Sequence, residues 1–183
     1  FDTMLDTIRA LCMDPDIDLD KKVYHSEMSH ISRNRAIAYL LESKGYIEKN
    51  KDVENSLHFY VKMCSLSVTA ESLAGLGLIL ANDGIHPDTG KRLLSSQTVK
   101  IVKTLMFTCG MYDGSGEFAV RVGIPSKSGV GGGILSVVDG EMGIGIFGPA
   151  LDKKGNSVAG ECVLEYMSHE LHLHMFDPQR HTL

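Results

Sequence analysis

Apolar residues recur every three or four positions over region 1–110 of the chain, which is the period of an α-helix with one buried face. Five helices are predicted from this spacing. Their apolar positions are Met4, Leu5, Ile8, Leu11 and Cys12; Ile37, Leu40 and Leu41; Leu57, Tyr60, Val61 and Cys64; Leu73, Leu76, Leu80 and Ala81; and Val99, Val102, Leu105 and Met106. Region 1–110 is therefore expected to be mostly helical.

Residues that commonly begin and end helices flank these segments. Asp2, Thr69 and either Ser95 or Ser96 carry side-chain oxygens that accept hydrogen bonds from the first N–H groups of a helix. Gly45 and the run 82–84 (Asn-Asp-Gly) stand where the helical spacing stops, as residues that adopt left-handed backbone conformations commonly do.

The spacing changes to a period of two after residue 116, which predicts strands. Apolar side chains alternate over 118–122 and 142–146, and 134–138 is a short run rich in β-branched residues. The positions concerned are Phe118, Val120 and Val122; Ile134 to Val138; and Met142, Ile144 and Ile146.

Asp139-Gly140 separates the last two of these strands and tolerates the positive φ angles of a tight hairpin, so they are expected to pair antiparallel. Gly143 and Gly145 share one face of the final strand, which would let a helix or another backbone approach closely. We therefore expect an antiparallel sheet with one tightly covered face.

A closing helix is expected after Asn156 or Ser157 as N-cap, with Glu161 near its positive end and an inner face formed by Val163, Met167 and Leu171. No internal repeat or linker interrupts the chain. The pattern therefore predicts a single α+β domain over 1–183, with a helical part (1–110) and a part made of the sheet and the C-terminal helix (111–183).

Composition and charge exclude several classes of protein. The chain is 43% hydrophobic and 22% charged, which is typical of a globular domain. No apolar stretch approaches the length of a membrane-spanning helix, about 20 residues. A net charge of −5 without a long basic run argues against nucleic acid as a partner. The four cysteines form no Cys-x-x-Cys pair, which argues against a zinc ribbon and fits a reducing cytoplasm.

Four familiar catalytic or binding motifs are not matched. His169 and His172 are three residues apart, whereas a zinc protease needs two histidines four apart, so no metal site is expected. The glycine run 129–133 lacks the Gly that precedes the Lys of a P-loop and leads into a strand, where a dinucleotide fingerprint needs a helix. No serine lies between glycines in a Gly-x-Ser-x-Gly elbow.

Lys127-Ser128-Gly129 stands directly before a predicted strand. A Lys-Ser/Thr-Gly triplet at a sheet edge is one element of the penicillin-recognising serine enzymes, where a cation and a hydroxyl lie beside the reacting carbonyl. The glycines that follow leave backbone N–H groups able to stabilise an oxyanion, and Val130 is the candidate donor. The alternative is an exposed, solvated lysine.

Four further positions have chemistry of their own. If 27–34 is one helix, Glu27 and Asn34 lie on the same face about 10.5 Å apart and can hold an ammonium group; the alternative is a carboxylate at the helix dipole and a solvated amide. Tyr60 is either a core tyrosine or a ligand contact. Tyr112, in a loop between glycines, either reaches a pocket or lies on a surface turn.

Taken together, several blocks resemble the serine-dependent glutaminase family from about Asp18 to Phe176. They are Ser26-Glu27, Arg33-Asn34-Arg35-Ala36, Phe59-Tyr60, Cys64-Ser65, Leu80-Ala81-Asn82-Asp83-Gly84, Cys109-Gly110-Met111-Tyr112-Asp113, Lys127-Ser128-Gly129-Val130 and Asp152-Lys153-Lys154-Gly155-Asn156-Ser157.

The resemblance implies a β-lactamase/transpeptidase-like fold and hydrolysis of L-glutamine to L-glutamate and ammonia through a serine acyl-enzyme, without a cofactor. It implies that Glu27, Asn34 and Tyr60 recognise the amino-acid end of glutamine. It also implies that Tyr112 assists proton transfer and that the Val130 N–H helps to form the oxyanion hole. A cytoplasmic homo-oligomer, a dimer or a tetramer, is the assembly that it implies.

One part of the family pattern is missing. The nucleophile of the family lies in Ser-x-x-Lys, and no serine of this chain has Lys three residues later. The chain is therefore expected to be the C-terminal part of a glutaminase domain, incomplete at its N-terminus and inactive by itself, with the nucleophile upstream of Phe1. Two alternatives stay open: a non-catalytic module that binds an amino acid or a partner, and a penicillin-type hydrolase.

Overall fold

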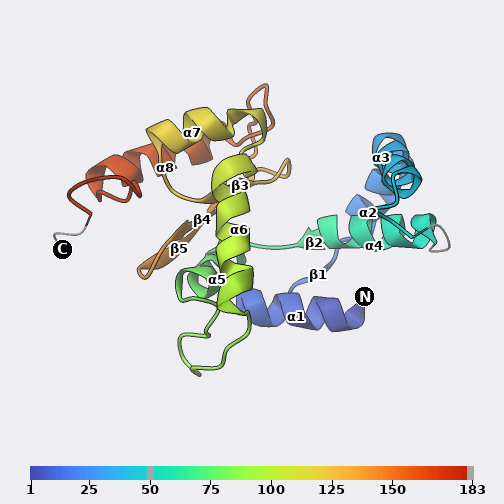
Figure 1. The fold of residues 1–183 in the computed structure, drawn as a ribbon, viewed down its shortest axis with the longest axis horizontal. Coiled ribbons are helices and arrows are strands. Elements are labelled where there is room, and N and C mark those ends of the chain that lie inside the picture. The colour runs from blue at the N-terminus through green and yellow to red at the C-terminus, as the bar shows by residue number, and fades with distance from the viewer. Residues whose placement is uncertain (49–51, 181–183) are drawn as a thin grey trace. The chain divides into compact units, whose positions relative to one another are not determined.

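A computed structural model describes residues 1–48 and 52–180, in which eight α-helices, one short 3-10 helix and five strands follow one another (Figure 1). Contacts along the chain divide it into two units. The first comprises residues 1–8 and 15–68, and the second comprises residues 9–14 and the chain from Thr69 onward. Helix α1 (Asp2–Cys12) contributes residues to both units.

The first unit is built around helices α2 (Lys21–Ser29), α3 (Ser32–Ser43) and α4 (Val53–Cys64). Strands β1 (Asp18–Leu19) and β2 (Leu66–Ser67) pair antiparallel beside them. The core of this unit consists of the buried residues Ile31, Val53, Leu57 and Val61, with Tyr24, Met28, Ala38 and Ile47 packed against them.

The predicted helix over the Ile37 segment is confirmed, and Gly45 follows it with a left-handed φ of 79°. Its predicted apolar face is not the one that packs, because Ile37 and Leu40 are 47% and 57% exposed. Within this unit α3 instead meets α4 through Ala38 and through an ion pair between Arg35 and Glu54.

The second unit has a three-stranded antiparallel sheet at its centre. Strand β4 (Gly133–Val138) lies between β3 (Ser126–Ser128) and β5 (Met142–Phe147), and the predicted hairpin is confirmed by the pairing of Val138 with Met142. Gly140 has the positive φ, 73°, that the turn requires.

Successive side chains of β4 enter two different cores, as the pleat of a strand requires. Ile134 and Val138 join the cluster formed with α7 (Ser115–Arg121) and α8 (Val158–Glu170). Leu135 and Val137 join the cluster formed with α5 (Ala70–Ala81) and α6 (Ser96–Cys109). The sheet is therefore covered by helices on both faces (Figure 1).

The close approach expected at Gly143 and Gly145 is confirmed. A Cβ atom on Gly145 would lie 1.8 Å from the carbonyl oxygen of Ala70, and one on Gly143 would lie 2.1 Å from the amide nitrogen of Leu78. Helix α5 can therefore rest directly on β5 only because these positions have no side chain.

Two predictions in this unit are wrong. Residues 118–122 belong to helix α7 and its C-cap and do not form a strand, because Phe118 and Val122, four residues apart, are both buried while Val120 is 79% exposed. Of the predicted inner face of α8, Met167 does pack against the core, but Val163 and Leu171 are nearly half exposed, and the buried residues of the helix are Gly160, Leu164 and Ser168. Ser157 is confirmed as the N-cap of α8.

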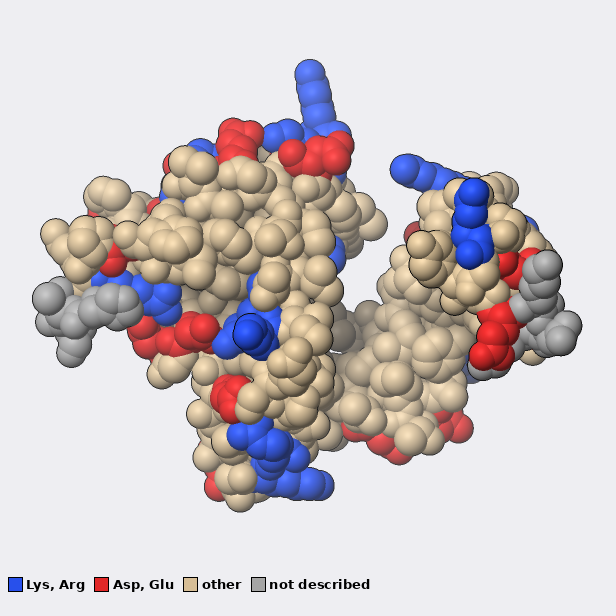
Figure 2. Space-filling view, viewed as in Figure 1, with Lys and Arg blue, Asp and Glu red and all other residues tan. Residues whose placement is uncertain are grey.

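Charged groups of both signs are interspersed over the face drawn in Figure 2, where the described residues form no continuous basic area. In the described part of the chain, no helix is long and apolar enough to cross a membrane.

Candidate functional site

Tyr112 lies just beyond the C-terminal end of α6, in the short 3-10 helix η1 (Tyr112–Gly114), as the loop position predicted. Its φ is 52°. This left-handed conformation costs a tyrosine on the order of 1 kcal/mol or more. The preceding Gly110 allows this turn to touch the sheet, because a Cβ atom there would lie 1.8 Å from the carbonyl oxygen of Ser126. The Ser128 N–H donates to the Gly110 carbonyl at 2.9 Å.

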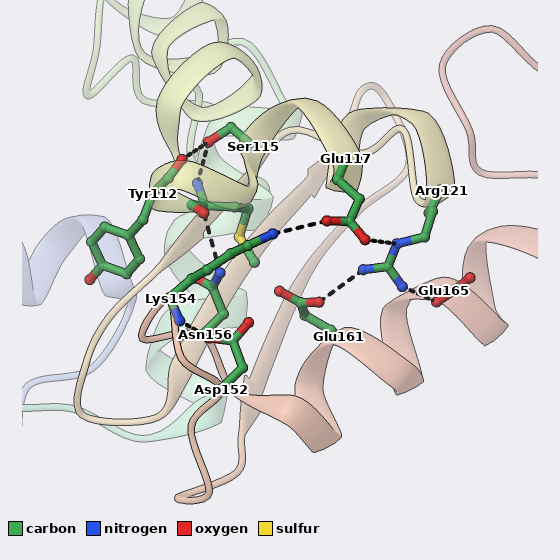
Figure 3. Close-up of polar contacts among 10 residues, drawn as sticks. Tyr112, Ser115, Glu117, Arg121, Asp152, Lys154, Asn156, Glu161 and Glu165 are labelled. Carbon is green, nitrogen blue, oxygen red and sulfur yellow. Dashed lines mark hydrogen bonds and ion pairs between the residues drawn. The ribbon is translucent and has the colours of Figure 1, made fainter.

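Two polar side chains hold the Tyr112 turn from within the protein (Figure 3). The Ser115 hydroxyl donates to the Tyr112 carbonyl at 2.8 Å and accepts from the Met111 N–H at 3.0 Å. The Asn156 side-chain amide donates to the Met111 carbonyl at 3.2 Å. Both polar groups of the Met111 backbone are therefore paired with side chains.

Lys127 is brought against Tyr112. Its ammonium group lies 4.7 Å from the centre of the Tyr112 ring and donates to the Ser128 carbonyl. Loss of solvent around the Lys127 ammonium lowers its pKa, and the nearby Cys109 thiol opposes this shift. Ser128 points the other way, with a buried hydroxyl that meets no partner among the described residues.

Val130 lies in a tight turn after β3. The Gly129 N–H donates to the Gly133 carbonyl and the Gly132 N–H donates to the Gly129 carbonyl, each at 2.9 Å. Within the described residues, the Val130 N–H meets no backbone acceptor. The Val130 side chain is 68% exposed.

Gly155 connects Val130 with Tyr112. A Cβ atom on Gly155 would lie 3.5 Å from Cγ1 of Val130 and 3.7 Å from Cε2 of Tyr112, which is van der Waals distance to both. Five of the predicted site residues therefore gather at one place in the second unit: Tyr112, Lys127, Ser128, Gly129 and Val130.

The remaining three predicted residues lie in the first unit. Glu27 is in the last turn of α2, Asn34 is in the first turn of α3, and Tyr60 is on α4. The condition of one helix over 27–34 is not met, because His30 caps α2 and Ile31 turns into the core of this unit at 4% exposure.

Tyr60 is not a core residue, so the first of its two predicted roles is wrong. Its side chain is 52% exposed, since the buried face of α4 is formed by Val53, Leu57 and Val61 at intervals of four. Tyr60 is therefore accessible to a ligand or a neighbouring segment.

An ion-pair network borders the Tyr112 turn (Figure 3). Lys154 donates to Glu117 at 2.9 Å, and Arg121 donates to Glu161 at 3.0 Å and to Glu165 at 2.6 Å. The hydrogen bond from Lys154 lowers the pKa of Glu117. All of these groups keep part of their surface in solvent, so the network contributes modestly to stability.

Sequence reasoning missed Ser115, Gly155 and the contact made by Asn156. The local pattern indicates Asn156 only as a helix cap, although its position in the block 152–157 is a signal that it has another use. In the part of the chain that is described, no group of three or more His, Cys, Asp or Glu side chains is arranged to hold a metal ion.

Two surface hollows in the described residues lie away from this place. One of about 360 Å³ lies beside Ser168, His172 and Asp177, and one of about 340 Å³ lies beside Val99 and Phe107. Neither is lined by a predicted site residue.

Comparison with known proteins identifies the family. The family model described as Glutaminase matches residues 1–176. The chain belongs to the glutaminase family. It is 53% identical over 173 residues to a glutaminase of Clostridium tetani, covering 94% of this chain and 56% of that relative, and 53% identical to one of Fusobacterium nucleatum, covering 96% and 57%.

A solved structure of a glutaminase gives the same result. The Bacillus subtilis glutaminase YbgJ, in a covalent complex with 5-oxo-L-norleucine, is 39% identical and superposes with a TM-score of 0.90 over 96% of this chain and 61% of that one. The predicted α+β, serine β-lactamase-like fold is thereby confirmed. The chain spans a little over half the length of the glutaminases it matches.

Proposed function

We propose that the complete protein is a glutaminase, which hydrolyses L-glutamine to L-glutamate and ammonia. The observation that carries the proposal is the grouping of Tyr112, Lys127 and the unpaired Val130 N–H at one place, in a chain of this family. The covalent complex of the Bacillus subtilis relative with 5-oxo-L-norleucine supports a covalent mechanism.

In the proposed mechanism, a serine of a Ser-x-x-Lys motif upstream of Phe1 attacks the side-chain amide carbon of glutamine. The developing oxyanion accepts a hydrogen bond from the Val130 N–H, and a preorganised donor of this kind is worth about 3 kcal/mol in the transition state. Tyr112 relays the serine proton to the leaving nitrogen, which departs as ammonia. Water then hydrolyses the acyl-enzyme to glutamate and regenerates the serine.

We propose that Glu27, Asn34 and Tyr60 recognise the amino-acid end of the substrate. The Glu27 carboxylate suits the α-ammonium group, and the Asn34 amide and the Tyr60 hydroxyl suit the α-carboxylate. Lys127 contributes positive charge beside Tyr112, while Ser128 and Gly129 shape the turn that presents Val130. The domain over 1–183 is then one part of a larger glutaminase domain, and no cofactor is required.

Two tyrosine variants of the full-length polypeptide test these roles. Tyr112→Phe is expected to lower kcat on the order of 100-fold or more, because a proton-transfer group is lost. Tyr60→Phe is expected to raise KM with a smaller change in kcat. Tyr166→Phe is the matched control, since Tyr166 is 68% exposed on α8. Full activity in Tyr112→Phe, or an unchanged KM in Tyr60→Phe, would remove the corresponding assignment.

We further propose a homo-oligomer, a dimer or a tetramer, in the cytoplasm. The apolar residues exposed on α3 support assembly, and the four cysteines, all unpaired, support a reducing compartment. Light scattering and cell fractionation test these two statements. A monomer at micromolar concentration, or recovery outside the cytoplasm, would contradict them.

One alternative keeps a specific observation in its favour. No serine of this chain has Lys three residues later, which a non-catalytic amino-acid-binding or interaction module would also show. Glutamine binding without turnover in the full-length polypeptide would establish that reading. Acylation by a β-lactam without reaction of glutamine would instead establish a penicillin-type hydrolase.

A further inference from the structure

The loop Asp152–Asn156 closes on itself through its own backbone. The Asp152 carboxylate accepts from the N–H groups of Lys154 at 2.8 Å and Asn156 at 2.9 Å, and the Asp152 N–H donates to the Asn156 carbonyl at 2.8 Å. Gly155 has a φ of 95°, which a residue with a side chain rarely adopts. The loop is therefore held in one conformation before it contacts anything else.

Asn156 is fully buried at 0% exposure, and only one of the two polar atoms of its side chain forms a hydrogen bond among the described residues. Its amide nitrogen donates to the Met111 carbonyl at 3.2 Å, whereas its side-chain oxygen accepts no hydrogen bond from the described residues. A buried acceptor without a partner is costly. An apolar residue would avoid this cost, and the bond to Met111 is the interaction that only the asparagine provides.

The same loop reaches both proposed catalytic groups. Through Asn156 it holds the carbonyl of the residue before Tyr112, at the point where the backbone turns left-handed. This carbonyl also accepts from the Gly114 N–H at 3.0 Å, within the turn itself. At Gly155 it passes beside both residues, because a Cβ atom added there would lie 3.7 Å from Cε2 of Tyr112 and 3.5 Å from Cγ1 of Val130. The same loop therefore lies beside the Tyr112 turn and beside the Val130 turn.

We propose that Asn156 is a positioning residue that, through its hydrogen bond to the Met111 carbonyl, keeps the Tyr112 phenol in register with the oxyanion-binding turn at Val130. The expected loss of kcat rests on the proposed function. The expected displacement of Tyr112 does not depend on it. In this role Asn156 acts through Tyr112.

The expected effect follows from geometry. Displacement of a catalytic group by about 1 Å costs on the order of 100-fold in rate. Asn156→Ala in the full-length polypeptide is therefore expected to lower kcat about 10- to 100-fold while KM changes less than about 3-fold, because the amino-acid end of the substrate is held elsewhere.

A second readout does not depend on activity. With tyrosine labelled with 13C at Cζ, the resonance of Tyr112 is assigned by its loss in Tyr112→Phe. Asn156→Ala is expected to move or broaden this resonance. Asn82→Ala is the matched control, because Asn82 also donates its side-chain amide to a backbone carbonyl, that of Ile85 at 2.9 Å, but stands at the C-cap of α5.

Asn156→Asp provides a variant that can be switched. A protonated carboxyl group can donate to the Met111 carbonyl, and an ionised one cannot. The ratio of kcat in Asn156→Asp to kcat in the wild type is therefore expected to fall as pH rises, whereas Asn82→Asp is expected to give a flat ratio.

The outcomes separate the two proposals. Wild-type protein that does not hydrolyse glutamine would contradict the proposed function, while the Tyr112 resonance would still decide the inference on the same samples. A folded Asn156→Ala protein with the kcat and Tyr112 resonance of Asn82→Ala would overturn the inference. If Asn156→Ala does not fold, a pH-independent ratio in Asn156→Asp would overturn it.

Discussion

Replacement of Gly145 by alanine tests the packing that holds the second unit together. A Cβ atom at this position of β5 would lie 1.8 Å from the Ala70 carbonyl oxygen and 2.7 Å from the Ala74 amide nitrogen. Both obstacles are backbone atoms of α5, so no side-chain rotation relieves the clash. Overpacking typically costs about 1–3 kcal/mol, and we expect at least the upper end, about 3 kcal/mol.

For a chain of this size, that loss corresponds to a decrease in Tm of about 6–12 °C. Circular dichroism during heating measures it, and hydrogen exchange identifies the affected element, since the α5 amides should lose protection first. Gly116→Ala is the matched control, because the position lies in α7 with nothing within 4 Å of the added atom. There alanine is expected to leave the free energy of unfolding unchanged or to raise it by up to about 1 kcal/mol, so Tm should not fall.

A Gly145→Ala protein whose Tm lies within about 2 °C of the wild type would refute the reasoning. That result would mean that α5 and the sheet can move apart at little cost, and that the contact between them is not tightly packed. A large loss of Tm without loss of protection in α5 would show that the strain is relieved elsewhere.

Three other substitutions or modifications test separate features. Backbone N–H groups, that of Asn156 first, hold the pKa of Asp152 below its usual value, so the stability it contributes is present at neutral pH and is lost as pH falls through its folded pKa. Asp152→Asn, which keeps the acceptor oxygen, should flatten the acid limb of a Tm–pH curve, and an unchanged limb would contradict this. Burial, with a smaller contribution from the Asp14 carboxylate, raises the pKa of the Cys12 thiol to about 11. At pH 8 iodoacetamide should therefore modify native protein only at the exposed cysteines, which are Cys64, Cys109 and Cys162. Peptide mass spectrometry measures the modification, and rapid modification of Cys12 would refute its burial. Ser157→Ala removes a buried N-cap whose hydroxyl accepts from Gly160 and donates to Gly148. Urea unfolding should show a loss of about 1–3 kcal/mol, and a loss of only about 0.5 kcal/mol would show that other groups cap α8.

Local spacing was sufficient to locate the elements whose ends are marked by caps and turns. The helix over Ala70–Ala81, with Thr69 as its cap and Asn82 as its end, and the hairpin around Gly140 have the positions that the sequence predicts. Caps, turns and periodicity act over a few residues, and their geometry does not depend on what packs against them.

The same reasoning was wrong where one pattern fits two structures. Apolar residues at 118, 120 and 122 match a strand, but the pair Phe118 and Val122 also matches a helix, and burial against α8 and the sheet decides for the helix. No Gly or Pro marks the break between α2 and α3, so the local sequence does not predict it. The chain turns there where Ile31 enters the core of the first unit.

The chemistry of the site was readable from the sequence as residue types, but its geometry was not. Tyr112, Lys127 and Val130 stand out through their glycine-rich surroundings and the resemblance of their blocks to a family. The bond between Asn156 and Met111 joins positions 45 residues apart, and no local pattern requires it. Only the packing of the loop before α8 against the turn that follows α6 brings these two residues together, because contacts between distant residues are decided by how buried faces fit and not by the chain's local preferences.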